Sequence, residues 1–390
     1  MIDVARARAE TPGCRDVVHL NNAGAALPTR AVLDTVIKHL ELEARIGGYA
    51  AADAVAERSR AVYSSVASLL GAATDEIALV ENATRAWDMV AYSLGASFAP
   101  GDRILTSRAE YASNVIGLLQ LARRTGAQVE VVPDDESGQL SVDALRGLLD
   151  ERVKLVAMSW IPTQGGLVNP AAAVGAVTRE AGVPYLLDAC QAAGQLPIDV
   201  GALGCDFLSA TGRKYLRAPR GTGVLYVRRE WVTQLDPPFL DVHAAQWASG
   251  DEVIVRDDAR RFESWERSVA NQLGLGAAVD HALKLGVDAI AARVVALGVR
   301  LREELTGVPG LTLHDRGVER CGIVTFTIDG IDVHELATRL RGEGINISVS
   351  TIDFARYDFE ARGLTAVARA SVHYYNTEDE LTRLVESLHP

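Results

Sequence analysis

Cysteine is scarce in this sequence, and its positions suggest no shared task. The four cysteines are Cys14, Cys190, Cys205 and Cys321, and none of them forms a CxxC pair. This spacing predicts reduced, mostly buried thiols and argues against a disulfide framework or a zinc site. The histidines give the same answer for metals, because the eight of them form no HxxxH or HExxH pair, so we expect no bound metal.

Long apolar runs and an excess of basic residues are also missing. No stretch approaches the roughly 18 apolar residues of a membrane span. Residues 1–10 mix Arg, Asp and Glu and lack the apolar region of a secretory signal, so we expect a cytoplasmic protein without membrane association. The 39 basic and 51 acidic residues give a net charge of −12, which argues against a nucleic-acid partner. A local cationic pocket for a small anion is still compatible with this charge.

The middle of the chain alternates apolar runs with amphipathic stretches. Expected strands span 102–108, 128–133, 153–160, 184–190, 206–212 and 221–227, and helical patterns at 141–150 and 171–182 fall between them. Several of the strands are apolar throughout, as expected for strands that are buried on both faces. The alternation predicts an α/β fold with a mainly parallel sheet wrapped by helices.

The last third of the chain has a different pattern. Strands are expected at 322–329, 345–350 and 367–375, and helices at 332–344 and 377–389, the last opened by a capping box of Thr377 and Glu380. These elements predict a small α+β domain, joined to the large domain by a long helical stretch over 269–305. We therefore expect three parts, which are an N-terminal arm (1–20), a large domain (21–268), and the linking helix with the small domain (269–390).

Polar residues follow several of the expected strands, at the sheet edge where open parallel sheets bind ligands. Asp188 ends an apolar strand, so its carboxylate needs a cation or donor partner; alternatively, it caps the next helix. Lys214 follows another strand in a Gly-containing turn, where a lowered pKa would make its amine nucleophilic toward an aldehyde. Thr211 and Arg213 in that turn could bind a phosphate, although a solvated basic turn would have the same composition. Thr163 follows a third strand.

Taken together, Asp188 and Lys214 indicate pyridoxal 5′-phosphate (PLP). This cofactor needs a carboxylate that keeps its ring nitrogen protonated and a lysine that holds its aldehyde carbon. A carboxylate and a lysine at the ends of successive strands meet both needs.

Three segments carry a resemblance to a known family: DACQAAGQLPIDV (188–200), DFLSATGRKYLRAPRGTGVLYV (206–227) and RASVHYYNT (369–377). With these segments the chain resembles the class V aminotransferases of PLP fold type I, which include cysteine desulfurases and kynureninase. The resemblance implies a seven-stranded large domain, a small C-terminal α+β domain, and a homodimer whose subunits complete each other's active sites.

The resemblance also implies roles for individual residues. Lys214 would hold PLP as a Schiff base and move the Cα proton, Asp188 would pair with the ring nitrogen, and Gln191 with the ring oxygen. The implied phosphate ligands are Ala83, Thr84, Thr211 and Arg213. The implied substrate ligands are Arg369, for the α-carboxylate, and Asn21 and Asn22. Structural alternatives are that Thr84 caps its helix and that Arg369 pairs with Glu378 or Glu380.

The chain departs from the family pattern at several positions. Tyr111, in AEYASN, stands where desulfurases have the His that stacks on the ring, and Thr163 stands where an Asn is common; Tyr111 thus joins Lys214 and Asp188 as a catalytic candidate. Segment 347–365 contains no cysteine, although persulfide-forming desulfurases carry their nucleophilic thiol there. Arg356 in that segment either contacts a second substrate anion or lies on a solvated lid. Glu266 replaces a phosphate-binding Thr, so we expect a reorganised loop in which Trp265 or Ser268 approaches the site.

These features favour a C–S β-lyase that cleaves an S-substituted cysteine to a thiol, pyruvate and ammonia. RFESWERS and ARGL resemble the C–S lyases of ergothioneine and lincosamide pathways, and the Ala-, Arg- and Gly-rich composition fits a bacterial antibiotic or other secondary pathway. Alternatives are an aminotransferase, an epimerase or a decarboxylation-coupled oxidative deaminase on the same substrate class. A non-catalytic PLP-fold binding protein is the alternative from another class.

Overall fold

A computed structural model gives the structure of the protein and describes residues 2–388. Its α-helices are α1 (Val4–Ala9), α2 (Asn22–Ala25), α3 (Arg30–Ile46), α4 (Gly48–Ala54), α5 (Ala56–Leu70), α6 (Ala83–Gly95), α7 (Ala112–Thr125), α8 (Val142–Leu148), α9 (Ala171–Ala181), α10 (Val200–Leu203), α11 (Arg229–Val232), α12 (Val269–Leu285), α13 (Val287–Leu305), α14 (Val333–Gly342), α15 (Arg356–Arg362) and α16 (Glu378–Glu386). Its strands are β1 (Val18–His19), β2 (Ile77–Val80), β3 (Arg103–Ser107), β4 (Gln128–Val132), β5 (Val153–Ser159), β6 (Tyr185–Asp188), β7 (Phe207–Thr211), β8 (Gly223–Val227), β9 (Ala245–Ser249), β10 (Glu252–Val255), β11 (Leu311–Leu313), β12 (Ile323–Ile328), β13 (Ile345–Asn346), β14 (Ser348–Thr351) and β15 (Ala366–Ser371). Short 3₁₀ helices are η1 (Pro12–Arg15), η2 (Thr74–Glu76), η3 (Ala259–Phe262) and η4 (Ile352–Phe354).

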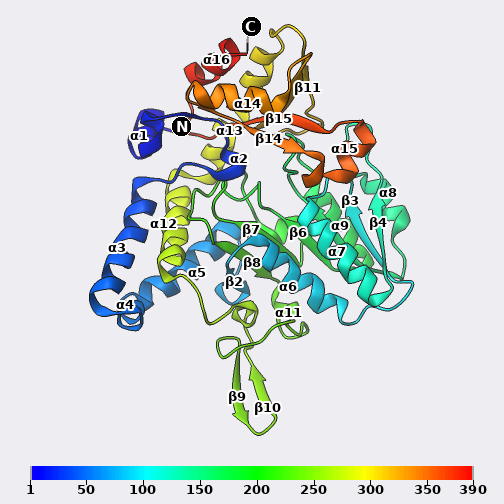
Figure 1. Cartoon of the computed structure of the whole chain (residues 1–390). Coiled ribbons are helices and arrows are strands. Elements are labelled where there is room, and N and C mark those ends of the chain that lie inside the picture. Colours follow the sequence, from blue (N-terminus) through cyan, green and yellow to red (C-terminus); the bar gives the residue numbers. More distant parts are fainter. Residues whose placement is uncertain (1, 389–390) are drawn as a thin grey trace.

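A seven-stranded sheet forms the centre of the large domain, in the order β2-β8-β7-β6-β5-β3-β4. The strands from β7 to β4 run parallel, whereas β8 is antiparallel to both β7 and β2. The expectation of an α/β fold with a mainly parallel sheet is therefore confirmed, and the six expected strands of the middle region all form (Figure 1).

Both faces of this sheet are buried, because successive residues of its strands belong to separate apolar clusters. Leu187 and Leu208 pack on the face that α5, α9 and α12 cover. Leu186 and Phe207, their neighbours in the chain, pack on the other face, which α6 and α7 cover. This double burial explains why the strands are apolar throughout instead of alternating. It leaves the strand ends as the places where polar side chains can gather.

The C-terminal part forms a small α+β domain around a four-stranded antiparallel sheet, in the order β11-β12-β15-β14. The capping box of α16 forms as expected, with Thr377 accepting from the Glu380 N–H and the Glu380 carboxylate accepting from that of Thr377. β1 pairs in parallel with β13, so the N-terminal segment lies against this domain (Figure 1).

The long helical stretch expected over 269–305 is two helices, α12 and α13, which is a correction. Gly286 separates them with a φ of 85°, a backbone conformation that glycine adopts without steric cost. α12 packs against α3 and α5, whereas α13 packs against β12 and α16 of the small domain.

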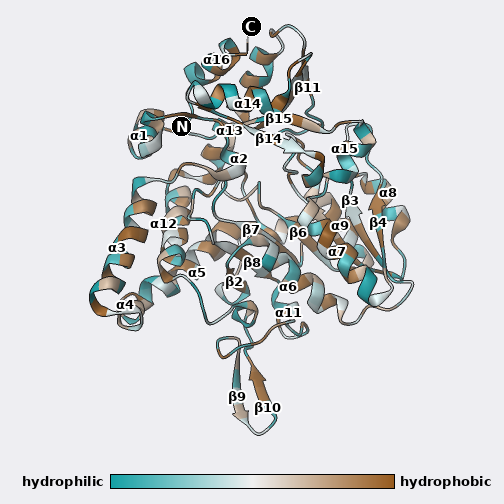
Figure 2. Ribbon diagram, in the orientation of Figure 1, coloured by the Kyte–Doolittle hydropathy of each residue, from teal (hydrophilic) through white to brown (hydrophobic). Residues whose placement is uncertain are grey.

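A hairpin of β9 and β10 projects away from the body of the molecule (Figure 1). It exposes large apolar side chains, among them Trp247 (77% exposed), Val253 and Ile254, and Figure 2 shows the apolar character of β10. The sequence patterns above did not predict this hairpin. Over residues 2–388, no helix is both long enough and apolar enough to cross a bilayer.

Candidate active site

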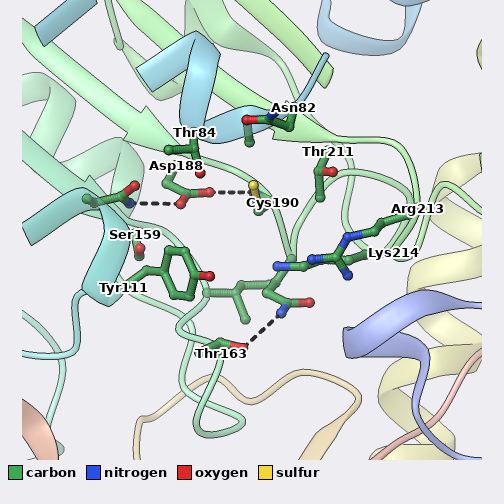
Figure 3. Close-up of a pocket in the computed structure, with 14 residues that line it drawn as sticks. Asn82, Thr84, Tyr111, Ser159, Thr163, Asp188, Cys190, Thr211, Arg213 and Lys214 are labelled. Atoms are coloured by element: carbon green, nitrogen blue, oxygen red, sulfur yellow. Dashed lines mark hydrogen bonds between the residues drawn. The ribbon is translucent and has the colours of Figure 1, made fainter. Parts of the chain in front are cut away.

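A pocket lies at the carboxyl edge of the central sheet, between the ends of β5, β6 and β7 and the first turns of α6 and α7 (Figure 3). It contains about 580 Å³ of space, part of it open to solvent. Every residue expected to hold the cofactor borders it, namely Ala83, Thr84, Tyr111, Thr163, Asp188, Gln191, Thr211, Arg213 and Lys214. Asp188 and Lys214 therefore meet at one pocket.

Asp188 is held by two donors. The Asn114 side-chain amide donates to its Oδ2 at 2.9 Å, and the Cys190 N–H donates to its Oδ1 at 2.7 Å. The side chain is buried at the end of β6, with both oxygens fixed. Such a carboxylate is rigid and ready to accept one further donor from the pocket.

Lys214 lies in the turn after β7, and burial lowers the pKa of its amine. Gly194 lets this turn pack closely against the segment after Asp188, since a Cβ on Gly194 would lie 2.5 Å from backbone atoms of Tyr215. Arg217 holds the far side of the turn, donating to the Leu27 carbonyl at 2.7 Å from a left-handed conformation (φ 63°). These contacts give the lysine a defined direction into the pocket.

The N-terminus of α6 points its free N–H groups at the pocket, a natural site for a phosphate. Asn82 caps this helix by accepting from the Arg85 N–H. The alternative in which Thr84 is the cap is thus wrong, and its hydroxyl stays available at the pocket wall. Thr211 and Arg213 border the same space.

The side chains of Thr163 and Gln191 meet at the pocket wall. The Gln191 amide donates to the Thr163 hydroxyl at 3.3 Å and to the Ala23 carbonyl at 3.1 Å. Tyr111 lies before the first residue of α7 and borders the same pocket (Figure 3).

Arg369 lies behind Thr163, on β15 of the small domain. It donates to the Thr163 carbonyl at 2.8 Å, to the Thr163 hydroxyl at 2.7 Å, and to Asn21 at 3.4 Å. Burial lowers the pKa of this guanidinium to about 10. Glu378 and Glu380 do not pair with it, because they pair instead with arginines of other elements, Arg293 and Arg8 respectively.

None of the four expected substrate ligands borders the pocket itself. Arg369 reaches its wall through Thr163 and contacts Asn21, whereas Asn22 and Arg356 have other partners. The buried Asn22 amide donates to the carbonyls of Ser371 and His19, so it joins the N-terminal segment to the small domain. Arg356 is exposed on α15 and pairs with Asp353 and Glu360 at 3.2 and 3.1 Å.

The loop before α12 likewise stays away from this pocket within the chain. Trp265 is exposed, and Ser268 caps α12 by accepting from the Asn271 N–H. Ser268 borders a separate cavity beside β2 and Gly221. Glu266 is exposed and borders neither cavity.

The cysteines are poor candidates for a nucleophile. Burial raises the pKa of Cys205 and Cys321 to about 12 and that of Cys14 less strongly. Cys190 borders the pocket, but burial and the neighbouring Asp188 carboxylate raise the pKa of its thiol well above the usual value. Segment 347–365, which carries no thiol, forms β14, η4 and α15.

Further residues that border the pocket were missed in the sequence, among them Asn82, Asn114 and Ser159. The sequence carried a signal for two of these residues. Ser159 is the last residue of β5, as Asp188 is of β6, and Asn82 stands directly before a helix, in a typical capping position.

The residues around the pocket fit PLP. Gln191 Oε1 and Arg369 Nε are buried and have no hydrogen-bond partner within residues 2–388, a state that a bound ligand would relieve. The pocket also offers a helix N-terminus for a phosphate, a fixed carboxylate for a ring nitrogen and a buried amine for an aldehyde.

Comparisons with known proteins agree with this assignment. The model of the family "Aminotransferase class-V" matches residues 18–384. A probable cysteine desulfurase of Xylella fastidiosa (strain 9a5c) is 33% identical over 379 residues, covering 96% of this chain and 90% of that protein. The crystal structure of the cysteine desulfurase CsdA from Escherichia coli superposes with a TM-score of 0.93 at 26% identity, covering 100% of this chain and 98% of that one. The cystine C–S lyase C-DES, at 22% identity and a TM-score of 0.87, covers 97% of this chain and 100% of its own and shares the fold.

Fold and site thus define a PLP-dependent enzyme of fold type I. The chain belongs to the class V aminotransferase family and is cysteine desulfurase-like.

Proposed function

We propose that this enzyme is a C–S β-lyase acting on a cysteine-type substrate. An S-substituted cysteine and water would yield a thiol, pyruvate and ammonia. Bound PLP would supply the electron sink that makes the Cα proton acidic. The desulfurase-like relatives support a substrate with a carbon–sulfur bond, and the observation that carries the lyase assignment is the absence of a thiol from segment 347–365.

The chain's own residues would divide the work as follows. The Arg369 guanidinium would bind the substrate carboxylate, since its Nε is buried and free of partners within the described chain. Lys214 would take the Cα proton, because its amine borders the pocket and burial lowers its pKa. Asp188 would hold a proton on the ring nitrogen, and Tyr111 would pack on the ring face.

A desulfurase without its loop thiol would need another sulfur acceptor. Cys190 is the thiol that borders the pocket, and its raised pKa keeps it protonated. A thiol in that state is a weak nucleophile. Direct release of the sulfur leaving group is the reaction that these residues support.

Product analysis separates the two reactions. Purified holoenzyme is incubated with cysteine and with S-alkyl and S-aryl cysteines, and products are identified by mass spectrometry. We expect pyruvate and free thiol from an S-substituted cysteine. A desulfurase leaves alanine instead, and alanine without pyruvate would overturn the proposal, as would no product from any substrate of the panel.

A homodimer is part of this proposal. The β9–β10 hairpin exposes Trp247, Val253 and Ile254 far from the core of its own chain, and apolar groups presented in this way favour contact with a second protein. Sedimentation analysis should give twice the 41.7 kDa mass of the chain. A monomer at micromolar concentration would contradict this part.

A further inference from the structure

Glu110 is a buried carboxylate directly beneath the pocket. It is 2% exposed and lies between the end of β3 and the start of α7. Its Oε1 accepts from the Tyr111 N–H at 2.8 Å and from the Asn114 amide at 2.9 Å. Its Oε2 accepts from the Ser159 N–H at 2.7 Å, and the Ser159 hydroxyl donates to Oε1. All of these partners are donors, which suits an ionised carboxylate.

The Asn114 amide bridges Glu110 and Asp188. Its Nδ2 donates to Glu110 Oε1 and to Asp188 Oδ2, each at 2.9 Å. A side-chain amide nitrogen has two protons, so both are used here. The opposite orientation would place the amide oxygen against two carboxylates, and Glu110 therefore fixes which end of Asn114 faces Asp188.

We propose that Glu110 is a positioning residue, which acts through Asn114 to hold the Asp188 carboxylate aimed at the ring nitrogen of the cofactor. The inference rests on the proposed function, since it takes Asp188 as the partner of that nitrogen. A negative charge one amide away makes Asp188 a stronger acceptor, because hydrogen-bonded groups polarise one another in a buried network. The proton on the ring nitrogen is held more firmly as a result.

The ionisable groups that bear on Glu110 lie on β6. They are Asp188, whose charge opposes a second negative charge, and the buried Tyr185. Burial raises the pKa of Glu110 to about 7. The network is therefore tested above that pH, where Glu110 is ionised.

The test uses the holoenzyme, with the cofactor isotopically labelled at its ring nitrogen. NMR of this nitrogen at a pH of about 8 reports its protonation directly, and titration of apoenzyme with PLP gives the cofactor Kd. For Glu110→Gln and Asn114→Ala we expect the signal to move toward the unprotonated form, with a Kd raised about tenfold. The double variant should match the single variants, because both changes break the same bridge.

Glu380→Gln is the matched control. Glu380 is also a buried glutamate that accepts from an asparagine four residues away, Asn376, at 2.8 Å, but it lies at α16. In the Glu380→Gln holoenzyme, the signal of the cofactor ring nitrogen and the cofactor Kd should equal those of the wild type. A purely structural role of Glu110 would lower thermal stability without moving the nitrogen signal.

Three outcomes would overturn the inference. A Glu110→Gln holoenzyme with the wild-type nitrogen signal would do so, and so would additive effects in the double variant. If Glu110→Gln does not fold, the Asn114→Ala variant is the test. A wild-type nitrogen signal in that variant would then overturn the inference. Failure of the proposed function looks different, since the substrate panel would then give alanine without pyruvate, or no product, while the nitrogen signal still moved in Glu110→Gln and Asn114→Ala.

Discussion

The two sides of the pocket are built in different ways. The cofactor side comes from ends of neighbouring strands and from the starts of the helices beside them, with Asp188 at the end of β6, Lys214 after β7 and Thr84 in the first turn of α6. The substrate side joins distant segments, since Arg369 of β15 meets Thr163 and Asn21. One side is set by the order of strands in a sheet, and the other by how two parts of the chain dock.

This difference predicts how each side responds to change. Strand ends are held by the sheet and its buried faces, so the backbone of the cofactor side should stay in place when single side chains are replaced. The substrate side depends on a few polar contacts between the small domain and the large one. Changes there should affect substrate affinity and leave cofactor binding intact.

The largest expected effect tests the cofactor side. Lys214→Ala should lower kcat by about a thousandfold or more, because the amine that moves the proton is lost. The visible absorption band of the bound cofactor should change with it. Lys154→Ala is the control, since Lys154 is a partly exposed lysine of β5 that donates to the Glu151 carbonyl. A variant of Lys214 with more than a tenth of the activity would remove this residue from the mechanism.

The second effect concerns stability against pH. Burial raises the pKa of Glu110 from 4.5 to about 7 in the folded protein. The folded state therefore binds this proton more tightly than the unfolded state, and the associated stability is lost as the pH rises from about 4.5 through 7. Relative to Glu110→Gln, the wild-type free energy of unfolding should fall by about 3 kcal/mol over this range.

Denaturant titrations of the two apoenzymes at several pH values measure this difference. Glu378 supplies a control of opposite sign, because its hydrogen bond with Arg293 lowers the pKa of that carboxylate to about 2. The stability that Glu378 adds is present above a pH of about 4.5 and disappears on acidification. A pH-independent difference for Glu110→Gln would show that the carboxylate keeps its ordinary pKa in the folded protein.

The third effect tests the substrate side. Arg369→Lys keeps the positive charge but loses the planar fork that binds a carboxylate through two nitrogens. We expect kcat/KM to fall by roughly thirtyfold, or about 2 kcal/mol, with an unchanged PLP Kd. Arg300→Lys, at an exposed pair with Glu304, should leave both values unchanged. A higher Kd for PLP in Arg369→Lys would show that the substrate side also contributes to cofactor binding.

The sequence predicted residues at the ends of strands better than residues whose role depends on distant partners. Asp188 and Lys214 could be predicted because each follows a buried strand, and β6 and β7 are neighbours in the sheet. Glu110 follows β3 in the same manner, but its meaning depends on Ser159 and Asn114, whose approach requires the paired strands. A residue's distance from its partners along the chain thus limits what a local pattern can predict.

The positions that were not predicted have physical reasons of their own. Asn22 lies in a polar loop by sequence, and its burial follows from a partner, Ser371, in the small domain. Gly286 stands in a continuous helical pattern, where a glycine costs only about 1 kcal/mol. Its positive φ, and with it the break between α12 and α13, is decided by the packing of those helices on different parts of the molecule.

The smallest expected effect concerns the boundary of the substrate side. Arg356 forms exposed ion pairs with Asp353 and Glu360, and such pairs contribute about 0–1 kcal/mol. Arg356→Ala should therefore leave Tm nearly unchanged. For a cysteine with an uncharged S-alkyl substituent, kcat/KM should stay within about twofold of the wild-type value. The informative measurement compares that substrate with one carrying a carboxylate on its sulfur substituent. A loss confined to the anionic substrate would mean that α15 closes over the pocket during turnover and that the substrate side extends to Arg356. Equal values for both substrates would limit it to Arg369, Thr163 and their immediate contacts.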